Sequence, residues 1–210
     1  DQLVIDCSTI SSETAMYVGE QLEKAGIAFI DAPVSGGVAA AKAASLTFMV
    51  GGEQAHFTQA LPILQQLGKN IVHAGAAGNG SAAKICNNLV LASSMIAVSE
   101  AFTLAKHLGL PAQTLFDICA NASGQCWSLT SYCPAPGVLE GVPANNDYQP
   151  GFSAAMMLKD LLLAQQAAEH SQTHTPLTAQ ALELYQQFVD DGHADMDFSG
   201  IITLLENTAN

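Results

Sequence analysis

The pattern of apolar and polar positions changes character once along this chain, near residue 77. Before that point, short apolar runs typical of buried strands alternate with stretches of helical periodicity. A strand, a helix and a second strand in that order indicate a parallel α/β unit. The predicted strands lie within residues 1–9 and at 27–31, 45–50 and 70–73, and the predicted helices between them lie at 12–25 and 53–67.

Beyond that point every periodic segment predicts a helix. The first, at residues 81–108, would be about 42 Å long at 1.5 Å per residue and is apolar nearly all round. Such a helix must be buried between domains or subunits, so we expect a homo-oligomer, at least a dimer. A Pro- and Gly-rich loop at 123–151 is expected to be functional or to wrap a partner. Further helices are predicted after Pro111 and at 153–169, 176–192 and 199–207.

A glycine-containing turn leads into the long helix and is followed by three polar side chains. Gly78 and Gly80 allow a sharp turn with exposed N–H groups. Lys84, Asn87 and Asn88 follow at spacings that can face one cleft. A lysine on an arbitrary helix is more often a solvated surface residue. Here the preceding glycines, the following apolar run and the scarcity of lysine favour a catalytic role.

Two further places carry candidate binding residues. Ser35, Gly36 and Gly37 follow a buried strand, and the two glycines allow close backbone approach and an anion-binding nest. The alternative is an ordinary turn that ends the strand. Lys159 and Asp160 interrupt an apolar helical stretch, where an unpaired charge is costly, so we expect a ligand or a charge partner. The alternative is a structural ion pair.

Charge and composition narrow the classes of partner. The chain has six lysines, no arginine and a formal net charge of −13, which argues against nucleic-acid binding. Anionic ligands must therefore be held by lysine, hydroxyls or backbone N–H groups. Five cysteines without a C-x-x-C pair indicate reduced thiols and no metal. His170 and His174 lie near Pro176, hence at a helix end, without a third ligand. No apolar stretch reaches the roughly 20 residues of a membrane span, so no membrane segment is expected.

Three motifs in this order resemble those of the β-hydroxyacid dehydrogenase family, and they lie at residues 31–37, 46–52 and 78–88. The loop at 127–137 and the segment 197–199 are similar, more narrowly, to the 3-hydroxyisobutyrate dehydrogenases within that family. The resemblance implies an α/β plus all-α fold. Residues 1–76 would be the C-terminal half of an NAD-binding Rossmann-like domain. Residues 77–210 would form a long inter-domain helix and an all-helical, 6-phosphogluconate-dehydrogenase-like domain for substrate binding and dimerisation.

The resemblance also implies an activity and roles for residues. It implies oxidation of a small 3-hydroxy acid, 3-hydroxyisobutyrate, to methylmalonate semialdehyde with NAD, as in valine catabolism. Lys84 would be the general acid/base that takes the hydroxyl proton as the hydride leaves. A dry helix near a positively charged nicotinamide would lower the pKa of this lysine. The other implied roles are substrate binding for Ser35, Gly36, Gly37, Asn87, Asn88 and Asp160, and cofactor binding for Thr9 and Lys159.

The chain departs from the family pattern in one respect. The family opens with a Gly-x-Gly-x-x-Gly strand–turn–helix that holds the pyrophosphate of NAD, and these residues contain no such motif. We therefore expect the chain by itself to be N-terminally truncated and inactive. The alternatives are a tartronate semialdehyde reductase, a phosphogluconate dehydrogenase and a non-catalytic dimerisation or binding module. The phosphogluconate dehydrogenase is disfavoured because no arginine is available for a phosphate. The expected form is a homo-dimer or homo-tetramer in a bacterial cytoplasm or a mitochondrial matrix, not a secreted protein.

Overall fold

The computed structural model describes residues 2–207, which divide into two compact units. The α/β unit comprises the residues up to Asn87 together with Gln166–Gln172. The helical unit comprises Asn88–Gln165 and the residues from Thr173 onward. The α/β plus all-helical character expected from the sequence is confirmed.

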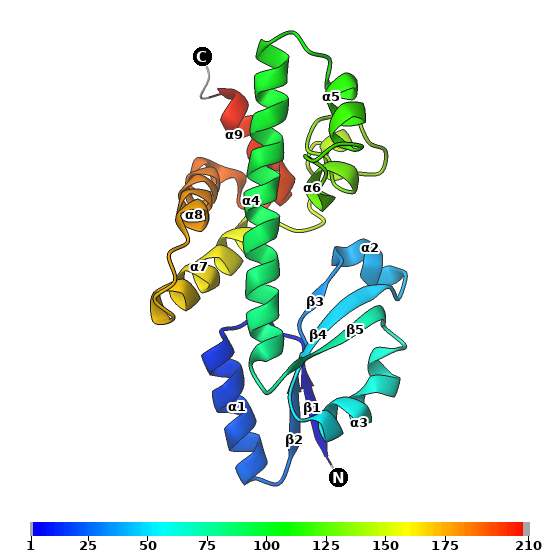
Figure 1. The fold of residues 1–210 in the computed structure, drawn as a ribbon, viewed down its shortest axis with the longest axis vertical. Helices are drawn as coiled ribbons and strands as arrows, with labels where there is room; N and C mark the ends of the chain where they lie inside the picture. Colours follow the sequence, from blue (N-terminus) through cyan, green and yellow to red (C-terminus); the bar gives the residue numbers. More distant parts are fainter. Residues whose placement is uncertain (1, 208–210) are drawn as a thin grey trace. The chain divides into compact units, whose positions relative to one another are not determined.

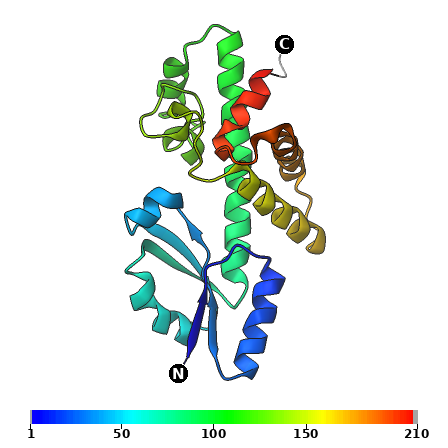
Figure 2. The same ribbon diagram turned by 180° about the vertical axis from the view of Figure 1, so that it is seen from behind.

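The α/β unit contains a mixed sheet with helices on both sides (Figures 1 and 2). The strands are hydrogen-bonded in the order β1-β2-β4-β3, and β5 pairs with β4. The pairs β1–β2 and β4–β5 are parallel, whereas β2–β4 and β3–β4 are antiparallel. In chain order the elements are β1 (Leu3–Asp6), α1 (Ser12–Lys24), β2 (Ala28–Asp31), β3 (Val34–Ser35), α2 (Gly37–Lys42), β4 (Leu46–Gly51), α3 (Gln54–Leu64) and β5 (Gly68–Gly75).

The predicted strands and helices of this unit are present, with the parallel β1–β2 pair that the strand–helix–strand order indicated. Two elements were not predicted, the two-residue strand β3 and the six-residue helix α2. Neither is long enough to give a periodic apolar pattern. The core of the sheet is built from apolar side chains that the strands and α3 bury together, namely Ile30, Ala32, Phe48, Val50, Ala60 and Leu64.

The helical unit is organised around one long helix, α4 (Asn79–His107), whose first turns belong to the α/β unit (Figure 1). The predicted loop at 123–151 contains two short helical segments, α6 and η1. The helix predicted to reach residue 192 ends at Phe188 and continues as the π-helical turn η2. The remaining elements are α5 (Ala112–Cys119), α6 (Trp127–Thr130), η1 (Pro143–Asn145), α7 (Ala154–His170), α8 (Pro176–Phe188), η2 (Val189–His193), η3 (Phe198–Gly200) and α9 (Ile201–Asn207).

The helix α4 contributes to both cores of the helical unit. Met95 packs in one of them with side chains of α7 and α8, and Phe102 packs in the other with side chains of the 123–151 segment. The expectation that no segment suits a membrane span needs correction, because α4 is long and apolar enough by length and composition. Half of that apolar stretch is buried inside the protein. This helix therefore forms the centre of the helical unit.

A buried carboxylate ties the 123–151 segment to the residues before α9. Asp197 is fully buried, and its Oδ2 accepts hydrogen bonds from the Tyr132 hydroxyl at 2.9 Å and from the N–H groups of Gly151 and Phe152. Its Oδ1 accepts from the N–H and the hydroxyl of Ser199. Burial, and then the negative charge of Asp197, raise the pKa of Tyr132, so this hydroxyl stays a donor. Asp197 is thus the polar centre of the helical unit.

We predict that Asp197→Asn lowers the free energy of unfolding by about 3 kcal/mol. Hydrogen-bond donors contact both oxygens of the Asp197 carboxylate, and the asparagine amide has only one oxygen that can accept them. The measurement is a urea titration followed by circular dichroism. Asp191→Asn, at an exposed position on η2, is the matched control and should change the value by less than about 0.5 kcal/mol. Equal stability of the two variants would contradict the role assigned to Asp197.

Candidate active site

The first turn of α4 is capped by a buried carboxylate from the end of β2. Oδ1 of Asp31 accepts from the N–H of Gly78 at 2.8 Å, and Oδ2 accepts from the N–H of Ser81 at 2.7 Å. Asp31 is 1% exposed. A negative charge at a helix N-terminus is favourable because the N–H groups there lack partners within the helix. The expectation that the N–H groups of this turn are exposed was wrong, since Asp31 already binds two of them.

The two glycines of the turn serve different purposes. Gly78 has a φ of 87°, a conformation that glycine adopts without strain. Gly80 allows close approach, because a Cβ there would overlap the carbonyl oxygen of Met49 and lie 2.6 Å from that of Asp31. A Cβ on Gly51 would likewise overlap Oδ1 of Asp31. Strands β2 and β4 and the start of α4 therefore meet backbone to backbone.

The three polar side chains after this turn differ in exposure. Lys84 is 8% exposed and Asn88, one helical turn later, is 2% exposed. Asn87 is exposed. Burial of a lysine side chain to this degree is rare for a residue that serves only solubility. The structure thus brings Lys84 and Asn88 to one face of α4 and leaves Asn87 at the surface.

Asn88 is held by Asp160 of α7. Its Nδ2 donates to Oδ2 of Asp160 at 2.5 Å, and Nζ of Lys159 lies 3.2 Å from Oδ1 of the same carboxylate. Asp160 is 3% exposed, whereas the side chain of Lys159 is 52% exposed. The sequence indicated an apolar setting for both, which is right for Asp160 only. A carboxylate accepts but does not donate, so the contact fixes the orientation of the Asn88 amide.

The Ser35-Gly36-Gly37 turn joins β3 to α2. Ser35 pairs with Thr47 of β4 and is half-buried, while the glycines are exposed. Gly36 and Gly37 have φ values of 128° and 65°. A Cβ on Gly36 would lie 2.5 Å from that of Ala40, so this conformation excludes other residues. The backbone has the successive positive-φ glycines that an anion-binding turn can use.

Thr9 lies in the loop that follows β1. The next helix is capped by Ser11, whose Oγ accepts from the N–H of Thr14 at 3.1 Å. Thr9 is half-buried at the carboxyl end of a parallel strand. Ligands of open α/β sheets bind at that end of the strands. Thr9 is therefore not used as a cap.

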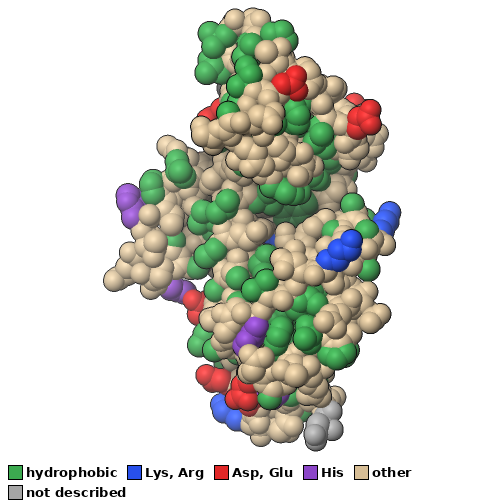
Figure 3. Space-filling view, turned by 45° about the vertical axis from the view of Figure 1, so that its right-hand side comes forward, with side chains coloured by type: hydrophobic (Ala, Val, Ile, Leu, Met, Phe, Trp, Pro, Cys, Tyr) green, Lys and Arg blue, Asp and Glu red, His purple; other side chains and the backbone are tan. Residues whose placement is uncertain are grey.

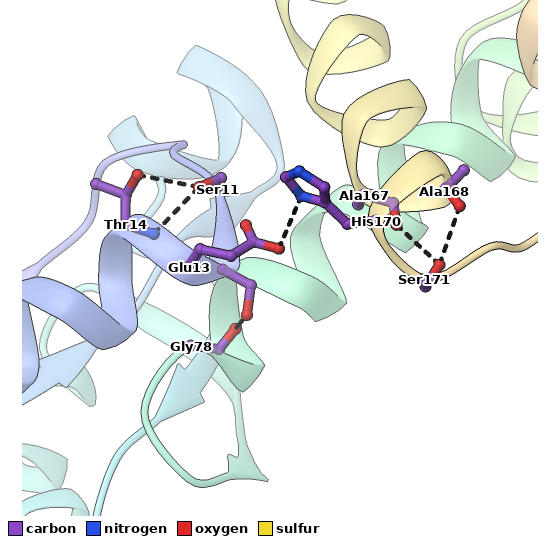
Figure 4. A network of polar contacts seen from close by, with 9 residues as sticks. Ser11, Glu13, Thr14, Gly78, Ala167, Ala168, His170 and Ser171 are labelled. Carbon is purple, nitrogen blue, oxygen red and sulfur yellow. Dashed lines mark hydrogen bonds and ion pairs between the residues drawn. The ribbon is translucent and has the colours of Figure 1, made fainter.

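Polar contacts also join the first turn of α1 to the start of α4 and the end of α7 (Figure 4). The hydroxyl of Ser12 donates to the carbonyl of Gly78 at 2.9 Å. Oε1 of Glu13 lies 3.5 Å from Nδ1 of His170. His170 is the last residue of α7, so the helix end predicted near it is confirmed. The backbone N–H of Glu13, then Ser11 and His170, lower the pKa of Glu13. Because this pair is exposed, it adds little to stability.

Two family models together match nearly the whole chain. The model described as the NAD-binding part of NADP-dependent 3-hydroxyisobutyrate dehydrogenase matches residues 78–205, and that of the NAD-binding domain of 6-phosphogluconate dehydrogenase matches residues 1–75. The probable 3-hydroxyisobutyrate dehydrogenase of Mycobacterium tuberculosis is 49% identical over 208 residues. The chain belongs to the 3-hydroxyisobutyrate dehydrogenase family. The resemblance drawn from three motifs is therefore confirmed. By family, the chain is an NAD-dependent oxidoreductase.

Further relatives and a solved structure are similar to this chain. The mitochondrial enzyme of Bos taurus is 46% identical, and the NAD-dependent L-serine dehydrogenase of Pseudomonas aeruginosa is 45% identical. The solved structure of the Mycobacterium tuberculosis enzyme with L-serine has a TM-score of 0.92 and 49% identity, and covers 97% of this chain. The chain spans 70% of the mycobacterial relative and 60% of the bovine one.

The described residues fit part of a nicotinamide dinucleotide site. The loop with Thr9 lies where such folds bind ligands. The start of α4 has a Gly-x-Gly spacing, as pyrophosphate turns do, but Asp31 already binds the N–H groups of Gly78 and Ser81. A second anion at that turn would meet a buried negative charge. The turn at α4 therefore does not hold the pyrophosphate.

We predict that Asn88→Asp destabilises the protein by about 2 kcal/mol or more at pH 8, because two buried carboxylates would then face each other at 2.5 Å. Such a pair shares a proton in the folded state, so its folded pKa is raised and stability returns as the pH falls toward 5. Urea titrations at pH 5 and pH 8 measure this.

The double variant Asn88→Asp with Asp160→Asn is the control, because it exchanges the amide and the carboxylate and restores the hydrogen bond. We expect the double variant to recover, at pH 8, most of the free energy of unfolding that Asn88→Asp loses relative to the wild-type protein. A single variant equally stable at both pH values would contradict the contact.

Proposed function

We propose that the protein oxidises 3-hydroxyisobutyrate to methylmalonate semialdehyde with NAD, as a step of valine catabolism. The observation that carries the proposal is the buried Lys84, one helical turn before an Asn88 that is held by Asp160. Family membership supports the reaction class. We further propose residues 1–76 as half of the cofactor-binding domain, and 77–210 as the long helix with the substrate and dimerisation domain.

In this reaction Lys84 moves the proton. NAD, when bound, accepts a hydride from the carbon that carries the hydroxyl. The hydroxyl proton must leave at the same time, and the amine of Lys84 takes it as general base and returns it in the reverse direction. Lys84 is only 8% exposed, and limited access of water favours proton transfer between the substrate and the side chain. Asn88, oriented by Asp160, aligns the hydroxyl.

The remaining candidates bind substrate and cofactor. Because the chain has no arginine, the substrate carboxylate is held by the hydroxyl of Ser35 and by the backbone of Gly36 and Gly37. Exposed Asn87 contributes at the edge of the site. Thr9 and Lys159 contact the cofactor, and the ion-pair distance between Lys159 and Asp160 supports a link between the cofactor and substrate residues.

A second candidate substrate is L-serine, which is also a 3-hydroxy acid with a primary alcohol. The support is the 45% identity to the NAD-dependent L-serine dehydrogenase of Pseudomonas aeruginosa and the solved mycobacterial relative with L-serine. Tartronate semialdehyde reduction is a third reading with the same proton-transfer residues. A non-catalytic binding module is the fourth, and it gives no reason for a buried Lys84 one helical turn before a buried Asn88.

We predict that Lys84→Ala lowers kcat for 3-hydroxyisobutyrate by about 10³-fold and leaves NAD affinity within about twofold. The assay uses this chain and a form extended at its N-terminus by a glycine-rich strand–turn–helix, and we expect turnover in the extended form only. Lys69→Ala, at an exposed position on β5, is the control. Full turnover by the Lys84 variant would rule out the lysine base, and a preference for L-serine would favour the second substrate.

The protein is proposed to act as a homo-dimer or homo-tetramer in a bacterial cytoplasm or mitochondrial matrix, without nucleic-acid or membrane partners. The relatives include bacterial and mitochondrial enzymes. Figure 3 shows hydrophobic side chains exposed in several separate patches. On α4, Val90 and Leu104 are 63% and 59% exposed, and their spacing of 14 residues puts them on one face of the helix. Leu108, just after the end of α4, is 74% exposed. Such a face is suited to a second copy.

We predict that the wild-type protein is at least dimeric by light scattering at micromolar concentration, and that Val90→Glu with Leu104→Glu shifts it toward monomer. Two charges on the apolar face would be desolvated on association. Ile63→Glu, at an exposed apolar position on α3, is the control and should leave the mass unchanged. A monomeric wild-type protein would refute the oligomer.

A further inference from the structure

We propose that Asp31 is a positioning residue of the proton-transfer site, because its carboxylate fixes where α4 begins and so where Lys84 lies. This inference rests on the function proposed above for Lys84. Asp31 would touch neither substrate nor cofactor. It acts through the N–H groups of Gly78 and Ser81, which its two oxygens bind at 2.8 and 2.7 Å.

The carboxylate determines the start of the helix because it uses both oxygens. One N–H lies on the turn just before α4 and the other lies within its first turn. A bond to only one of them would still allow the first turn to unwind or tighten. Two charge-assisted bonds from one rigid carboxylate hold the turn in a single conformation. Asp31 is itself fixed by the pairing of β2 with β4, through Asp31 and Gly51.

The surroundings leave this turn little room to move. A Cβ on Gly51 would overlap Oδ1 of Asp31, so β4 lies directly against the carboxylate. On its other side, the hydroxyl of Ser12 donates to the carbonyl of Gly78 at 2.9 Å (Figure 4). A Cβ on Gly78 would lie 2.6 Å from Cγ of Met16. The turn is therefore held from the sheet by Asp31 and from α1 by Ser12.

Lys84 is sensitive to this contact because it follows Ser81 by less than one helical turn. A shift of the helix start by one residue would rotate each later side chain by about 100° and move it by about 1.5 Å along the axis. Either change would carry the Lys84 amine out of hydrogen-bond reach of a substrate hydroxyl. General acid–base catalysis tolerates little such displacement. Correct placement of Lys84 thus depends on the bonds that Asp31 makes.

The first test measures the accessibility of Lys84 and needs neither cofactor nor turnover. The chain is treated briefly with acetic anhydride, and acetylation of each lysine is followed by peptide mass spectrometry. In Asp31→Asn, whose amide can accept only one of the two N–H groups, we expect Lys84 to react at least fivefold faster relative to the exposed Lys69. Glu13→Gln, a surface carboxylate on α1, is the control and should leave the ratio unchanged. An unchanged ratio in folded Asp31→Asn would overturn the proposal.

The second test measures catalysis in the extended form. We expect Asp31→Asn to lower kcat by 10- to 100-fold per folded molecule, with the KM for NAD within about twofold, whereas a purely structural role would lower only the folded fraction. If Asp31→Asn does not fold, Ser12→Ala takes its place, since it loosens the same turn from the α1 side and leaves the Ser11 cap intact. In Ser12→Ala we expect a two- to threefold change in the acetylation of Lys84 relative to Lys69. An unchanged ratio would overturn the proposal.

The two proposals fail in different ways. Full turnover by Lys84→Ala would refute the proposed role of Lys84 as general base. The acetylation of Lys84 would still report whether Asp31 holds the start of α4. Inactive Lys84→Ala together with fully active Asp31→Asn would keep the lysine base and overturn the positioning role.

Discussion

The carboxylate of Asp31 in the N-terminus of α4 is the contact on which the α/β unit and the candidate site both depend. It lies at the end of β2, against Gly51 of β4, and binds two N–H groups of the turn that starts the long helix. A buried charge is stable there because the helix terminus offers unpaired donors and a favourable dipole. The same contact joins the end of β2 to the helix start and, as we propose, places Lys84.

The absence of arginine explains how the buried acids of this chain are stabilised. Asp31 is bound by backbone N–H groups, Asp160 by the amide of Asn88, and Asp197 by hydroxyls and backbone N–H groups of three segments. Each of these donors belongs to a fixed position of the fold, whereas an arginine could reach a carboxylate from several places. Buried carboxylates satisfied in this way specify local geometry as well as stability. Two of the three act near candidate site residues, because Asp160 binds Asn88 and Asp31 binds the N–H of Ser81, three residues before Lys84.

Much of the fold could be predicted from periodicity, because long amphipathic or apolar segments determine their own secondary structure. The two-residue strand β3 and the helix α2 could not, since they depend on the glycines at 36 and 37. For the site, the motif spacing identified Lys84 and Asn88. It could not separate buried Asn88 from exposed Asn87, nor find Asp31 as a cap from 47 residues upstream, because burial and long-range hydrogen bonds depend on tertiary packing.

The start of α4 illustrates how one spacing of glycines can serve opposite purposes. In a dinucleotide-binding turn, glycines let a helix N-terminus approach a phosphate that arrives from solution. In this chain Gly80 lets the helix approach β2 and β4, and the anion at the N-terminus is Asp31 of the protein itself. An internal anion cannot dissociate, so the helix start is fixed whether or not cofactor is bound. If Lys84 transfers the proton, as we propose, the helix gains from this permanence, because the position of Lys84 then does not vary with the binding state of the cofactor.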